Sequence, residues 1–120
     1  MPHEPRKFLH DLLDSARFLV GFTAGRKYED YISDRGFRSA VERELITIGE
    51  AVLRLNKLDA ALCGRISEYQ RIISFRNILV HGYDAIKPDL VWLVVTDKLG
   101  PLIAEAESLL QALQGPSNPP

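Results

Sequence analysis

The longest amphipathic pattern in the chain is the stretch DRGFRSAVERELITIGEAVLRL at residues 34–55. Its apolar side chains recur every three or four residues, at Phe37, Val41, Leu45, Ile48, Val52 and Leu55. An α-helix has about 3.6 residues per turn, so this spacing places them on one face of a helix. A polar stripe has matching spacing, at Arg43, Thr47, Glu50 and Arg54. The stretch therefore predicts a long helix with one buried face.

A glycine, Gly49, lies inside this predicted helix. Glycine costs about 1 kcal/mol relative to alanine in a helix interior. Its presence there favours a close approach by a neighbouring helix.

Helical spacing also precedes this stretch, with apolar residues at Leu9, Leu12, Leu13, Ala16, Leu19 and Val20. Gly25 is a plausible end for that first helix, and residues 28–33 are interpreted as a short connector. Residues 56–65 form either a short helix or a loop, ended by Gly64.

A further helix is predicted over residues 67–81. Ser67 and Gln70 have the spacing of a capping box at its start, and Gly82 can end it in the left-handed conformation. Pro88 suits the first turn of a last helix, in which Gly100-Pro101 should produce a kink. That helix begins with a run that is apolar all round, residues 90–95, which must be covered on several sides, by the core alone or by the core and a partner chain.

The fold class is therefore all-α, an antiparallel bundle of four main helices plus a short connecting helix. A chain of 120 residues fits one domain, which we place at residues 1–114. The remainder, GPSNPP at residues 115–120, is expected to be a disordered tail.

Composition excludes several classes of protein. The single cysteine, Cys63, excludes an internal disulfide framework and a multi-cysteine zinc site. The longest apolar run is far shorter than the roughly 20 residues that span a bilayer, and no signal peptide is visible. We therefore expect a cytoplasmic protein with no membrane attachment. We expect Cys63 to be a small buried residue rather than a nucleophile, and His3 and His10 to be surface residues with no metal.

Charge is nearly balanced along the chain, at −1 overall, which argues against a broad basic surface for nucleic acid. It is unevenly placed, however. Residues 64–87 carry four basic and two acidic side chains, whereas residues 88–120 carry one basic and four acidic side chains. An anion site should therefore be local and lie in the middle of the chain.

The helix over residues 67–81 carries an arginine in an apolar seam. The seam has the spacing 4, 3, 4 and 3, at Tyr69, Ile73, Arg76, Val80 and Tyr83. A guanidinium stays charged at ordinary pH, and burying it without a partner is strongly unfavourable. Arg76 must therefore reach an anion, the solvent at a groove, or a carboxylate such as that of Glu42, Glu44 or Glu50. A pair with one of these glutamates is the commoner outcome for such an arginine.

A second stripe on this helix is entirely polar, with Gln70, Ser74, Asn77 and His81. Arg76 and His81 are five residues apart, or about 140° around an ideal helix. They could converge on one group across the helix end or through a symmetric pairing of two chains. A histidine at a helix C-terminus also interacts favourably with the helix dipole, without any catalytic role. The spacing therefore indicates a candidate site but does not indicate a reaction.

The motif at residues 76–83, R-N-I-L-V-H-G-Y, resembles the R-x4-H-x-Y motif of HepT-like proteins, a branch of the HEPN ribonuclease superfamily. Residues 43–51, RELITIGEA, resemble that family's R-x-L-x-x-I-G-E-A segment. The approach to Arg76 at residues 73–75 and the last helix also resemble the family, so the likeness covers nearly the whole chain.

The resemblance implies an all-α homodimer in which the arginine and histidine of both chains face one cleft. It implies a metal-independent endoribonuclease toxin that needs no cofactor, with Arg76 and His81 catalytic and Asn77 in support. It also implies a minimal nucleotidyltransferase antitoxin, which blocks the toxin by adding AMP to Tyr83. Whether toxin and antitoxin form higher hetero-oligomers stays open.

Two other functions compete with this interpretation. The chain could be a non-catalytic partner of a nucleotidyltransferase that binds nucleotide or protein at the same groove, which the near-neutral charge favours. It could also be a purely structural dimer module. The intact R-x4-H-x-Y motif favours the enzyme.

Overall fold

The structure is a computed structural model, and it describes residues 4–114 apart from the side chain of Tyr83. Every element in that range is helical. In chain order they are α1 (Pro5–Phe22), α2 (Tyr28–Ser33), α3 (Arg35–Leu58), α4 (Ala60–Cys63), α5 (Tyr69–His81), the 3₁₀ turn η1 (Tyr83–Ala85), α6 (Pro88–Leu93), the π-helical turn η2 (Val94–Lys98) and α7 (Leu99–Gln114). The predicted disordered tail at residues 115–120 lies outside the described residues.

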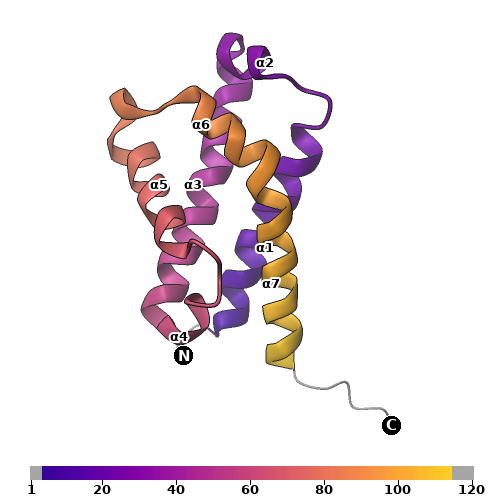
Figure 1. The fold of residues 1–120 in the computed structure, drawn as a ribbon, viewed down its shortest axis with the longest axis vertical. Helices are drawn as coiled ribbons and strands as arrows, with labels where there is room; N and C mark the ends of the chain where they lie inside the picture. Colours follow the sequence, from indigo (N-terminus) through magenta and orange to yellow (C-terminus); the bar gives the residue numbers. More distant parts are fainter. Residues whose placement is uncertain (1–3, 115–120) are drawn as a thin grey trace.

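Four long segments lie side by side in alternating directions, namely α1, α3, α5 and the rod formed by α6, η2 and α7 (Figure 1). Helix α3 contacts α1 on one side and α5 on another, and α7 packs on α1. This confirms the predicted all-α antiparallel bundle. None of the helices within residues 4–114 is long and apolar enough to cross a membrane.

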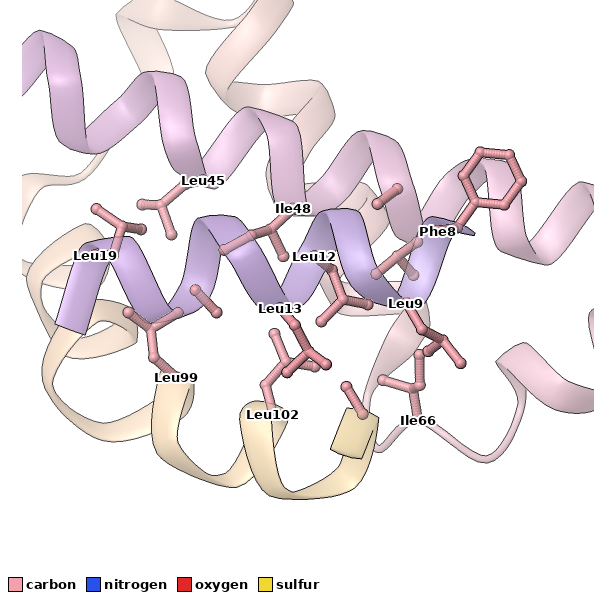
Figure 2. Packing of buried hydrophobic residues seen from close by; sticks show 14 of the residues in the cluster. Phe8, Leu9, Leu12, Leu13, Leu19, Leu45, Ile48, Ile66, Leu99 and Leu102 are labelled. Atoms are coloured by element: carbon pink, nitrogen blue, oxygen red, sulfur yellow. The ribbon is translucent and has the colours of Figure 1, made fainter. Parts of the chain in front are cut away.

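The core is built on the faces that the apolar spacing predicts. All six predicted apolar residues of α3 are buried. Figure 2 shows α1 between α3, which contributes Leu45 and Ile48, and α7, which contributes Leu99 and Leu102. Burying such a side chain stabilises the fold by roughly 1.5–3 kcal/mol. The prediction was wrong for Val20, which is 47% exposed near the end of α1.

Helix α3 starts where the sequence predicts and ends later than predicted. Asp34 caps its start by accepting a 3.0 Å hydrogen bond from the Phe37 backbone. The helix continues to Leu58, and Asp59 then caps the short helix α4, which ends at Gly64. Residues 28–33 form the helix α2 rather than a connector, and its start is held by the Asp30 carboxylate, which accepts a 2.8 Å hydrogen bond from the Lys27 backbone N–H.

The predicted N-terminal cap of α5 was wrong, whereas Gly82 ends the helix as predicted but in a different conformation. Ser67 does not cap the helix, because its backbone N–H (3.1 Å) and its hydroxyl both donate to the carboxylate of Glu105 on α7. The helix begins at Tyr69 instead, after Glu68 in the left-handed region with φ 58°. Gly82 ends the helix with φ −117°, outside the left-handed region, because the chain turns directly into η1.

The last helical rod changes its helix type just before Pro101. A proline has no N–H, and its ring would meet the carbonyl four residues earlier, at Asp97. The π-helical turn η2 includes that position and widens the backbone there. In the apolar run, Val91 and Val95 are buried, whereas Leu90 and Leu93 are 42% and 44% exposed. The run is therefore covered on one side only within a single chain.

Candidate active site

Helix α5 lies on α3 and leaves most of its surface exposed. Its one buried side chain is Leu79, and the predicted polar stripe of Gln70, Ser74, Asn77 and His81 is exposed throughout. The predicted seam holds only in part. Tyr69, Ile73 and Arg76 are half-buried, but Val80 is 38% exposed.

Gly49 lies where α3 and α5 approach each other closely. A Cβ atom at this position would lie 2.2 Å from Cβ of Arg76 and 2.7 Å from its Cγ. No real side chain tolerates these separations, so only glycine allows the observed approach. The predicted close helix contact is confirmed, and it falls on the backbone of the candidate site residue.

Arg76 is held by the residue that follows this glycine. One of its terminal nitrogens lies 2.8 Å from Oε2 of Glu50, and the other donates a 2.9 Å hydrogen bond to Oδ1 of Asn77. The Arg76 side chain is 20% exposed, and its Nε is buried without a hydrogen-bond partner. The predicted carboxylate contact is therefore confirmed, with Glu50 as the partner among the three glutamates considered.

The Glu50 carboxylate contacts two arginines, Arg54 and Arg76. Its Oε1 accepts a 3.0 Å hydrogen bond from Nε of Arg54, one turn further along α3. That hydrogen bond, together with the charge of Arg76, holds the pKa of the Glu50 carboxyl below its ordinary value, although burial acts against this. Glu50 is therefore a carboxylate at neutral pH, flanked by two guanidinium groups.

His81 is the last residue of α5 and is exposed. Within the described residues, no hydrogen bond or ion pair joins it to Arg76. Arg76 points to the α3 side, whereas His81 lies about 140° further around the helix. One chain thus presents the two groups on different sides of α5.

Tyr83 begins the 3₁₀ turn η1, and its side chain lies outside the described residues. The α-helix stops at His81, so the spacing that would place Tyr83 on the face of Arg76 does not continue this far.

Comparison with known proteins decides the family. The family model described as "Ribonuclease HepT-like" matches residues 12–109, which include the whole of α3 and α5. The chain belongs to the HepT-like family. This confirms the resemblance carried by residues 43–51 and 76–83.

Curated relatives of this HepT-like chain bear ribonuclease names. "Putative RNase MJ1380" of Methanocaldococcus jannaschii is 31% identical over 85% of this chain and 93% of its own length. "Putative RNase MJ0127" of the same organism is 28% identical over 92% and 90%. "Probable ribonuclease HepT" of Thermococcus cleftensis is 25% identical over 91% and 98%. No solved structure matches the chain.

Other polar groups of the HepT-like chain lie away from this site. Cys63 is buried, its Sγ lies 3.6 Å from the carbonyl oxygen of Val52, and burial raises the pKa of its thiol to about 11. It is therefore a thiol at neutral pH and not a nucleophile, as predicted. His10 is exposed on α1, as predicted, and His3 lies outside the described residues.

A groove of about 460 Å³ lies on the other flank of α5, between α5 and the rod of α6, η2 and α7. Its floor is Leu45 and Ile48 of α3, and Phe75, Ile78 and Leu90 line its walls. Neither Arg76 nor His81 lines it. Sequence reasoning missed this groove because it exists only where three segments diverge.

Sequence reasoning also gave no role to Arg54. The signal was present in the polar stripe of α3, where Arg54 follows Glu50 by one turn. Only the contact between Glu50 and Arg76 shows that this stripe reaches the candidate site.

Proposed function

We propose that this ribonuclease is the toxin of a toxin–antitoxin pair and cleaves RNA with Arg76 and His81, without a metal ion. The observation that supports this most strongly is the environment of Arg76. Gly49 admits it to the α3–α5 contact, Glu50 holds one end of its guanidinium, and Nε has no partner. An arginine held for structure alone would normally have its donors satisfied.

The reaction needs only groups that RNA and these side chains supply. A base removes the proton of a 2′-OH, and the oxygen attacks the adjacent phosphorus as the bond to the 5′-oxygen breaks. An acid gives a proton to that 5′-oxygen, so the products are a 2′,3′-cyclic phosphate and a 5′-hydroxyl. Imidazole titrates near neutrality and suits either proton transfer. A guanidinium stabilises the negative charge that develops on the phosphate oxygens.

Two chains would complete this site. The reaction wants a base and an acid, each chain carries one motif histidine, and a two-fold pair carries two. Apolar surface for such a pairing is available near α5, since Ile78, Val80, Leu90 and Leu93 are 37–44% exposed in one chain. We therefore propose a homodimer with the motif residues of both chains at one cleft.

The antitoxin in this proposal is a minimal nucleotidyltransferase that adds AMP to Tyr83. The added AMP would bring a further phosphate to the motif, where it would compete with RNA for Arg76. Tyr83→Phe should prevent incorporation of labelled AMP by the proposed nucleotidyltransferase partner. Unchanged labelling would exclude Tyr83 as the acceptor.

A non-catalytic binding module is the second candidate. The net charge of −1 favours it, because it gives RNA little long-range attraction, and Arg76 could hold a nucleotide phosphate without cleaving it. Its prediction is an unmodified protein that binds RNA or nucleotide and leaves both intact.

The deciding experiment incubates the full chain and its His81→Ala variant with mixed RNA in excess chelator. Intact mass first confirms that neither protein carries AMP, and light scattering gives the mass of the assembly. Fragment ends are then read by mass spectrometry. We expect cyclic phosphate or its hydrolysis product from the wild type alone. Intact RNA with unmodified wild type would favour the binding module, and a single-chain mass would overturn the dimer.

A further inference from the structure

We propose that Glu50 positions Arg54 and Arg76 as a pair, and that Arg54 binds an RNA phosphate next to the one bound by Arg76. This inference rests on the proposed function, since it adds a binding residue and a positioning residue to the same site. It starts from a shared contact. The two oxygens of one carboxylate are divided between two arginines on two helices, 3.0 Å from Nε of Arg54 and 2.8 Å from a terminal nitrogen of Arg76.

The charge of this cluster is unbalanced. One carboxylate lies between two guanidinium groups, so the three side chains together carry a charge of +1. An acidic partner from elsewhere does not correct this, because the ion pairs of both arginines within the described residues go to Glu50 alone. A local excess of positive charge attracts an anion.

Both arginines keep donors for such an anion. Glu50 engages Arg54 through Nε, so its two terminal nitrogens take no part in that bond, and the side chain is 59% exposed. Arg76 meets Glu50 through one nitrogen rather than through its planar fork. A guanidinium binds phosphate best through two parallel hydrogen bonds, and this arrangement leaves Arg54 able to form them.

The spacing matches a chain of phosphates rather than one isolated group. Glu50 and Arg54 are four residues apart on α3, or about 6 Å along the helix axis. Arg76 enters from α5 at Gly49 and Glu50. The two arginines are therefore side by side but reach from different helices, which suits neighbouring phosphates of one strand.

The proposed positioning role of Glu50 predicts an effect of its removal that differs from the effect of its negative charge alone. Removing a carboxylate beside a phosphate should tighten RNA binding if only net charge mattered. If Glu50 fixes the two guanidinium groups, Glu50→Gln should lower kcat about tenfold or more, because Arg76 is no longer aimed at the reacting phosphate. A lower kcat for Glu50→Gln would therefore indicate positioning, whereas tighter RNA binding with an unchanged kcat would indicate bulk electrostatics.

Binding is tested in the full chain carrying His81→Ala, so that RNA is not consumed. The probes are fluorescein-labelled single-stranded oligouridine and oligoadenosine, titrated at several salt concentrations. Adding Arg54→Gln should raise Kd about tenfold for both RNAs and reduce the slope of log K against log salt by about 0.7, the value for one phosphate of a single strand. Arg54→Lys should restore the slope, because it restores the charge, but only part of the affinity.

Arg17 provides the matched control. It lies on α1, is 51% exposed and forms an ion pair with Glu107 of α7, away from α5. Arg17→Gln should change Kd less than twofold. Helicity and dimer mass of every variant are measured first, so that a folding defect is recognised.

The outcomes separate this inference from the function on which it rests. If Arg76→Gln weakens RNA binding and Arg54→Gln acts like Arg17→Gln, the phosphate role of Arg54 is wrong and the proposed function stands. If neither Arg76→Gln nor Arg54→Gln changes binding, both are wrong. A Glu50→Gln enzyme with unchanged kcat would overturn the positioning role.

Discussion

Helices α1 and α5 both pack on α3, yet they do so very differently. Helix α1 buries seven side chains between α3 and α7, whereas α5 buries only Leu79. The first contact is continuous and apolar. The second combines partly buried apolar side chains with a glycine and an arginine–carboxylate pair. Stability is therefore concentrated on one side of α3, and the groups able to perform chemistry are concentrated on the other.

The difference between α1 and α5 predicts that substitutions of buried residues in α1 lower the free energy of unfolding most. Leu12→Ala removes a fully buried side chain and should lower the free energy of unfolding by about 2–5 kcal/mol. Ile72→Ala on α5 removes a side chain that is only partly buried, and should cost less, about 1 kcal/mol. Urea unfolding followed by circular dichroism measures both. Equal costs would mean that α5 belongs to the core as fully as α1.

Glycine substitutions sharpen the same contrast. Gly49→Ala places a Cβ 2.2 Å from Cβ of Arg76, so α5 must shift, at a cost of about 1–3 kcal/mol and with loss of RNA cleavage. Gly21→Ala in α1 meets nothing within 4 Å and should stabilise the helix by up to about 1 kcal/mol, with cleavage intact. Thermal unfolding and cleavage rates are compared for the two variants. A fully active Gly49→Ala enzyme would show that the close contact is not needed.

The smallest effect is the pH dependence of the Glu50 contact. The pKa of Glu50 is lower in the folded chain than its ordinary value of 4.5, so its contribution to stability is complete above 4.5 and is lost as the pH falls below it. The stability difference between wild type and Glu50→Gln should therefore shrink in acid. Since Glu50 is partly exposed, we expect this difference to be on the order of 1 kcal/mol at most. A difference that grows in acid would contradict the assigned ion pairs.

The sequence alone was sufficient to predict features that depend on the residues of a single helix. The stripes of α1 and α3 follow from regular spacing, and Gly49 signals a close contact because glycine is unfavourable inside a helix. The family resemblance was equally local, since it rests on residues 43–51 and 76–83.

The sequence alone did not predict features that depend on a contact with a residue far away in the chain. Ser67 looks like a helix cap until Glu105, 38 residues later, takes both of its donors. The seam on α5 assumed burial along its whole length, but α5 meets chiefly one neighbour, so Val80 stays exposed. Three glutamates could have paired with Arg76, and only the register at Gly49 selects Glu50. Arg54 was missed for the same reason.

The most direct test of the account measures RNA cleavage and unfolding on the same three proteins, namely wild type, Arg76→Ala and His81→Ala. We expect each substitution to reduce kcat/KM by at least about 100-fold, as loss of a charge-stabilising or proton-transferring group does. Helicity and the mass of the assembly should be unchanged, because neither side chain belongs to the buried apolar core. Cleavage that survives in both variants would contradict the assignment of α5 as the catalytic helix.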